Sequence, residues 1–80
     1  MSAETDSNIE LVYVRLLGEG TVVYRPAPAW ILGSDVAVLR APDDYDPNDE
    51  KWEFKPGTTV RFEHRSLEGS SVRVAISPAD

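Results

Sequence analysis

The sequence predicts a small all-β protein, a partly open antiparallel barrel of SH3-like type with five or six strands. Two observations support this fold. Short segments rich in β-branched and aromatic residues alternate with glycine-containing turns, and helix signals are almost absent from the 80 residues. Because a small all-β chain must bury one face and protect its edges, a barrel satisfies both needs. A small two-sheet sandwich is the alternative.

The first hairpin is predicted from residues 9–17 (IELVYVRLL) and 21–25 (TVVYR). Gly18-Glu19-Gly20 between them suits a three-residue loop that ends in a left-handed glycine. This register places Leu17 opposite Thr21 and Arg15 opposite Val23. Alternate positions then form one apolar face, which consists of Val12, Val14, Leu16, Val22 and Tyr24.

The middle of the chain predicts shorter elements. Residues 26–30 (PAPAW) suggest a stiff extended bend with Trp30 in the core, and residues 36–40 (VAVLR) suggest a strand. The irregular segment 42–51 contains Asp46-Pro47, an N-cap followed by proline at the first helical position, which predicts one helical turn. A short strand over 52–54 supplies two core aromatics, Trp52 and Phe54, and a Lys55-Pro56-Gly57 turn follows.

A second hairpin is predicted from residues 58–66 and 70–77, again with a three-residue loop ending in glycine, 67–69. One face of this hairpin is apolar. Its predicted cross-strand pairs are Val60 with Ile76, Phe62 with Val74, and His64 with Val72. The other face pairs Glu63 with Arg73 and flanks Glu63 with Arg61 and Arg65, so cross-strand ion pairing is expected there.

Composition and length exclude several classes of function. Without cysteine the chain has no disulfide, no thiolate nucleophile and no cysteine-ligated zinc, and this absence fits a cytoplasmic protein. No segment approaches the ~18 apolar residues of a membrane span. Residues 1–8 are polar, lack the pattern of a signal peptide and are interpreted as a disordered tail. The predicted single domain covers residues 9–77, with a second tail at 78–80.

The net charge of −6 argues against a general nucleic-acid binder, which needs a basic face. The charge is concentrated, however. The segment from Asp43 to Glu50 holds five acids and no base, which leaves a net charge of −1 on the other 72 residues. The prediction is therefore a nearly neutral barrel with one acidic loop.

Two resemblances follow from particular motifs. Residues 41–47 (APDDYDP) followed by 52–60 (WEFKPGTTV) resemble the acidic loop and diverging turn of an SH3 domain over about twenty residues. The Trp-Trp pair of that family is missing after Val60, so proline-rich ligand binding is not implied. More broadly, the pattern LLGEGTxVYRP, WEFxPGxxVR and LEG over 9–77 resembles a group of short uncharacterised bacterial proteins. This resemblance implies a stand-alone β-rich bacterial domain and no particular activity.

The acidic loop is the first candidate site, and its acids are Asp43, Asp44, Asp46, Asp49 and Glu50. Asp44, Asp46 and Asn48 match the first three ligand positions of a calcium loop. The sixth position is Asp49 instead of glycine, and the twelfth is Lys55 instead of glutamate. We therefore expect a solvated loop without a bound metal, with a looser cation site as the alternative.

His64 is the only histidine and is expected to be half-buried on the apolar face with one hydrogen bond. General-base catalysis requires a nucleophile and an orienting partner within reach, and the sequence shows neither. We therefore expect no enzyme activity and no cofactor. A small ligand-binding or catalytic protein that uses the acidic loop with His64 remains an alternative.

A recognition patch is the remaining candidate. Arg15 and Arg25 are predicted on the outer face of the first hairpin beside Tyr13, and arginine next to exposed aromatics is typical of protein interfaces. Trp30 and Tyr45 are further aromatic binding candidates. The sequence thus predicts a non-catalytic binding or regulatory domain that contacts another protein or a second copy of itself. An acidic decoy or immunity-type protein is a third possibility.

Overall fold

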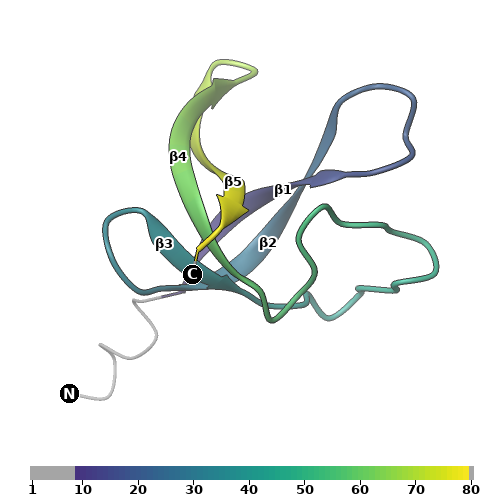
Figure 1. Ribbon diagram of the computed structural model, residues 1–80. Helices are drawn as coiled ribbons and strands as arrows, with labels where there is room; N and C mark the ends of the chain where they lie inside the picture. The colour runs from purple at the N-terminus through teal and green to yellow at the C-terminus, as the bar shows by residue number, and fades with distance from the viewer. Residues whose placement is uncertain (1–8, 80) are drawn as a thin grey trace.

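The computed structural model describes residues 9–79 as an all-β chain, and no helix forms within that range. Five strands follow one another around a closed barrel: β1 (Ile9–Leu16), β2 (Val23–Ile31), β3 (Val36–Leu39), β4 (Thr59–Leu67) and β5 (Ser70–Pro78) (Figure 1). The predicted fold class is confirmed, and the architecture is consistent with a small SH3-like barrel. The predicted tail over 1–8 and Asp80 lie outside the described residues.

The barrel is closed by a parallel pair. Sequential strands pair antiparallel from β1 to β5, so the first and fifth strands run in the same direction and can meet only in parallel. They meet at two positions, Val12 beside Arg73 and Tyr13 beside Val74. This short contact converts the partly open antiparallel barrel of the prediction into a closed one and removes the sandwich alternative.

The core fills the barrel with small and medium side chains, which suits a barrel of only five strands. Aromatic rings of Trp52 and Phe62 complete it, while Tyr45 and Phe54 pack against it from the edge. The predicted core role is confirmed for Trp52, whereas Phe54 is only partly buried and packs against the core from outside. The aliphatic members are Val12, Val14, Ala27, Ala29, Ala37, Leu39, Val60 and Ala75.

The predicted register of the first hairpin is wrong by one residue. Leu16 pairs with Val23 and Arg15 with Tyr24, so the loop contains residues 17–22 instead of three residues. Directly opposed residues share a face. The inward positions of β2 are therefore the odd ones, and Val22 is 57% exposed rather than part of the apolar face.

Strand β2 continues through Pro26 and Pro28. The sequence predicted a stiff extended bend over residues 26–30 instead. The carbonyl of Pro28 accepts a hydrogen bond from the Arg40 N–H at 2.8 Å, so the nitrogens of Pro28 and Pro26 face the β3 side of the strand. Strand β3 pairs only with Ala29–Ile31. Proline is tolerated here because its missing N–H leaves no strand partner unsatisfied, and it also protects the free edge.

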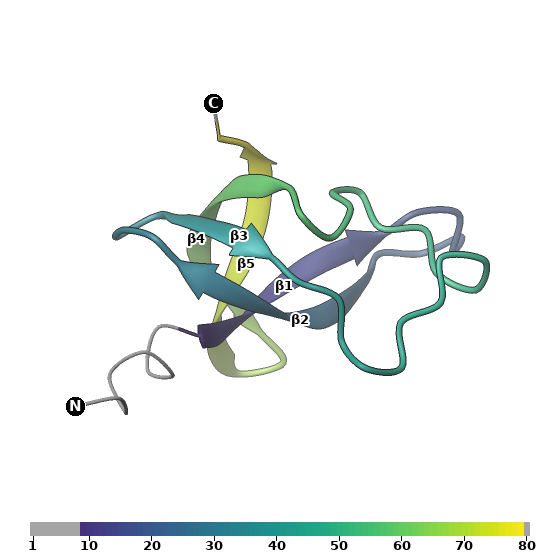
Figure 2. The ribbon, with the colours of Figure 1, turned by 90° about the horizontal axis from the view of Figure 1, so that it is seen from below.

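The long loop between β3 and β4 returns to the end of the first hairpin that carries its turn (Figure 2). Trp52 forms an isolated antiparallel bridge with Leu16 in place of the predicted short strand, and the Leu17 N–H donates to the Lys51 carbonyl at 2.7 Å. The predicted helical turn at Asp46 is present. The Asp46 carboxylate accepts a hydrogen bond from the Asn48 N–H at 2.9 Å. The Asp46 carbonyl accepts hydrogen bonds from the N–H groups of Asp49 and Glu50.

The second hairpin also differs by one residue. Leu67 pairs with Ser70, so the turn has two residues, Glu68 and Gly69, both with positive φ. This register changes the partner of Phe62 from Val74 to Ala75, and a bulge between Arg61 and Phe62 then shifts the pairing once more, so that Arg61 lies opposite Ser77. Arg73 then faces the same side as His64 and pairs with Glu10 instead of Glu63.

Two aromatic side chains are more exposed to solvent than the sequence predicts. Trp30 is half-buried on the outer face of β2, where the Arg40 guanidinium lies 5.3 Å from its ring centroid. His64 is exposed and packs edge-on against Phe62 at 6.1 Å between ring centroids. The position of Trp30 follows from alternation, because its neighbour Ala29 points into the core. His64 keeps the side of Phe62, two residues earlier, as predicted, but it lies beyond the core cluster and is exposed.

Candidate functional site, a cleft between two hairpins

The two long hairpins cross and then diverge, so that their outer faces are opposed. Figure 1 shows the β1–β2 hairpin and the β4–β5 hairpin as the two limbs of a V. The limbs meet where Tyr13 of β1 pairs with Val74 of β5. Between them lies a half-open cleft of about 630 Å³, hereafter the hairpin cleft. Its lining residues are Tyr13, Val22, Val23, Tyr24, Leu67, Glu68, Ser70 and Val72.

The walls of the hairpin cleft are apolar and aromatic. The first hairpin contributes two tyrosines and two valines, and the second contributes Leu67 and Val72. Val22 is the most exposed apolar residue of the lining, at 57%. Large apolar side chains left in a concave surface indicate binding more strongly than single exposed ones do.

The junction of the two limbs, at Val74, is a packing site separate from the barrel core. Val74 is only 1% exposed, yet it is not a member of the core cluster and shares its side of the sheet with Glu63 instead of Phe62. Its neighbour in sequence, Ala75, faces the core. Strand β5 is thus buried on both faces where the limbs meet, next to the hairpin cleft but outside its lining.

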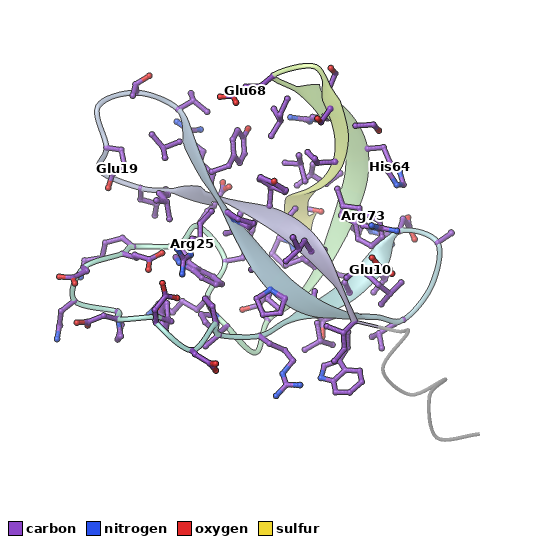
Figure 3. The ribbon with its side chains drawn as sticks, turned by 180° about the vertical axis from the view of Figure 1, so that it is seen from behind. Glu10, Glu19, Arg25, His64, Glu68 and Arg73 are labelled. Atoms are coloured by element: carbon purple, nitrogen blue, oxygen red, sulfur yellow. The ribbon has the colours of Figure 1, made fainter. Side chains whose placement is uncertain are left out.

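The charged groups around the cleft are unevenly placed. Glu68 is the only charged residue of the lining, and Figure 3 shows its carboxylate at the tip of the second hairpin, turned toward the first. On the far side of Tyr24, Arg65 donates a hydrogen bond to Glu63, and this carboxylate raises the pKa of the Arg65 guanidinium above its ordinary value. Arg65 is therefore already paired, whereas Glu68 makes no ion pair within residues 9–79.

Glu68 also has an unusual backbone. Its φ of 51° makes it the one non-glycine residue in the described chain with positive φ. Two consecutive positive φ values define a type I′ turn, for which Asn-Gly is preferred. A glutamate in this conformation costs stability, and such costs are frequent at functional positions.

The binding residues predicted from the sequence are dispersed. Tyr13 lines the hairpin cleft, and Arg15 is exposed in an adjoining depression that contains Glu19. Trp30 lies on a different outer face with Arg40, and Tyr45 packs edge-on against Trp52 at 5.0 Å between centroids. Of these four residues, Tyr13 and Arg15 lie on the same strand beside the hairpin cleft, and Trp30 and Tyr45 do not.

Arg25 is not on the outer face of the first hairpin, as predicted, but opposite Val14 on the inner one. From there its guanidinium reaches the acidic loop, with 2.5 Å between Nη2 and Asp44 Oδ1 and 3.4 Å between Nε and Glu50 Oε1. The same Glu50 oxygen accepts a hydrogen bond from Trp52 Nε1 at 3.0 Å. Two of the five loop acids therefore hold the loop against the barrel end.

The remaining loop acids, Asp43, Asp46 and Asp49, are exposed. Within the described part of the chain, no three histidine, aspartate or glutamate side chains converge in a way that could hold a metal ion. His64 and Arg25, which marks the acidic loop, lie on opposite sides of the barrel in Figure 3. The structure thus does not bring His64 and the loop together as the alternative prediction requires.

Sequence reasoning missed most of the cleft, namely Val22, Val23, Leu67, Glu68, Ser70 and Val72, and it assigned Tyr24 to the apolar inner face. One feature of the sequence could have indicated the cleft. Both hairpins contain more apolar residues than are needed to form a single buried face. In the segment 22–24 three consecutive apolar residues precede Arg25, and strict alternation explains only part of them.

No protein-family model, curated protein or solved structure matches the chain. Among residues 9–79 there is also no helix with the length and apolar character needed to cross a membrane.

Proposed function

We propose that this protein is a non-catalytic, cytoplasmic binding domain, of bacterial type, which acts by holding part of another protein in the hairpin cleft. The observation that carries the proposal is the lining of the cleft, in which two tyrosines and four aliphatic side chains surround a half-open space. Tyrosine and exposed aliphatic side chains with a polar rim are the usual composition of a protein interface.

The chemistry of the cleft favours binding over catalysis. No polar or charged side chain is buried in the described residues, so the cleft offers no desolvated group to act as nucleophile, acid or base. A small-molecule site also uses a few precisely placed polar groups to orient its ligand. The polar groups of this cleft belong to Glu68, Ser70 and the two tyrosines, and they lie on a half-open surface, which is better suited to side chains supplied by a polypeptide.

The experiment is a selection from a random peptide display library, followed by chemical-shift mapping of selected peptides on the ¹⁵N-labelled protein. The expected result is a set of perturbed amides at Tyr13, Val22, Tyr24, Leu67 and Val72. Amides near Trp30 and Arg40, on a different outer face, serve as the internal control. Failure to select any peptide, or shifts centred on Trp30, would contradict the proposal.

A further inference from the structure

We propose that the hairpin cleft selects a partner segment in which a lysine or arginine adjoins an aliphatic or aromatic side chain, and that Glu68 is the residue that recognises the cation. This inference rests on the proposed function of the cleft and adds its specificity. It commits to one kind of occupant, a polypeptide segment carrying a positive charge.

The apolar part of this ligand follows from the position of the walls. Tyr24 and Val22 on one limb oppose Leu67 and Val72 on the other, so a side chain entering between them is covered from both sides. Burial of apolar surface on both sides of one side chain is the arrangement found at the energetic centre of interfaces. The half-burial of Tyr24, Leu67 and Val72 leaves surface available for that contact.

The cation follows from charge complementarity. Glu68 is the only charged group of the lining, is exposed, and has no ionic partner within residues 9–79. Glu19 lies in the loop of the opposite hairpin, so both hairpin tips present a carboxylate, as Figure 3 shows. A carboxylate at the edge of the cleft, with a second one in the adjoining depression, attracts a cationic segment and disfavours an acidic one, because like charges across an interface are repelled.

The backbone of Glu68 is a second observation that points to the same residue. Asparagine or glycine would occupy the first position of this turn with less strain, yet glutamate stands there at φ 51°. The chain therefore has an acid at a turn position of the second hairpin where a side chain other than asparagine is conformationally costly. A role for the carboxylate in recognition accounts for this choice.

The test compares peptide selections on the unchanged protein, Glu68→Gln, Glu68→Lys and Asp49→Asn. Asp49 is an exposed acid of the 40–58 loop, so Asp49→Asn removes the same net charge as Glu68→Gln but leaves the cleft intact. We expect the unchanged protein to select peptides with Lys or Arg next to an apolar residue. The best of these should bind Glu68→Gln about three- to tenfold more weakly and bind Asp49→Asn within about twofold.

The charge reversal sharpens the result. Glu68→Lys should select acidic peptides that still require the apolar residue, and circular dichroism should show the same strand signal for all four proteins. If apolar peptides bind in the cleft with no preference for Lys or Arg, the inference fails while the proposed function stands. If basic peptides weaken equally on Glu68→Gln and Asp49→Asn, the attraction is only net charge and the inference also fails. If no peptide is selected at all, both are contradicted.

Discussion

Tyr13 of β1 and Val74 of β5 are neighbours in the two-residue parallel pairing that closes the barrel. The pairing gives this point two roles. It completes the ring of five strands, and it forms the base from which the two hairpins diverge around the hairpin cleft. Val74 is buried here on the side of the sheet opposite the core, so its side chain packs the junction at which the barrel closes.

Truncation of this side chain should therefore destabilise the fold although it lies outside the core cluster. Val74→Ala removes two buried methyl groups, and we expect a loss of about 2 kcal/mol in the free energy of unfolding, measured by urea denaturation. Ile76→Ala is the control, because Ile76 lies on the same strand and is 41% exposed. Equal losses for the two variants would show that Val74 is not a packing centre.

The contacts of the acidic loop lead to a second prediction. Glu50→Ala leaves Trp52 Nε1 without its acceptor and Arg25 Nε without its nearby carboxylate. Loss of a partner at a part-buried donor costs about 1–3 kcal/mol, which thermal unfolding followed by tryptophan fluorescence will measure.

Asp44→Ala is the matched control for that prediction. The Asp44 side chain is 74% exposed against 18% for Glu50, so its ion pair with Arg25 is screened by water and should contribute less than about 1 kcal/mol. A larger effect for Asp44→Ala than for Glu50→Ala would contradict this ranking.

The strained turn supplies a third prediction. Glu68→Asn creates the Asn-Gly sequence preferred in a type I′ turn and should stabilise the protein by about 0.5–1 kcal/mol while removing the carboxylate. Differential scanning calorimetry should therefore show a higher Tm. Glu19→Asn is the control, since Glu19 does not have positive φ. A lower Tm for Glu68→Asn would mean that the Glu68 side chain stabilises the turn in a way that the structure does not show.

The sequence predicted the barrel, both hairpins, the helical turn at Asp46 and the core aromatic Trp52. These features depend on local chemistry, namely β-branched runs, turn residues and an N-cap, which one sequence displays directly. The single acidic loop was also visible. Its attachment to the barrel was not, because it depends on Arg25 turning inward after a register shift of one residue.

Register was the principal source of error. Leu67-Glu68-Gly69 fits a three-residue loop with only glycine in the left-handed region, and local preference favours that choice over a turn with glutamate at positive φ. The two-residue turn instead places Phe62 opposite Ala75 and turns Val74 to the side of the sheet opposite the core, and the bulge between Arg61 and Phe62 changes only the pairing beyond it. A pattern of alternation assumes one buried face and therefore could not predict a strand that is buried on both.

The cleft could not be predicted for the same reason. Apart from Val23, its residues come from the outer faces and the loops of two hairpins that are separated in sequence, and they meet because β1 and β5 pair at Tyr13 and Val74. The sequence predicted that Tyr13 and Arg15 lie side by side on the outer face of the first hairpin and contribute to binding. It placed Val22 and Tyr24 on the inner face through the incorrect register.

The most direct test of the central claim compares two exposed aliphatic residues of nearly equal exposure. Val22, 57% exposed, lines the hairpin cleft, and Leu32, 61% exposed, follows β2 on another part of the surface. Isothermal titration calorimetry of Val22→Asp and Leu32→Asp with a peptide selected on the unchanged protein measures what each side chain contributes to binding. We predict that Val22→Asp weakens binding at least about tenfold, because a charge replaces apolar surface buried by the ligand, while Leu32→Asp leaves it within about twofold. Equal affinities for the two variants, or a loss confined to Leu32→Asp, would contradict the account.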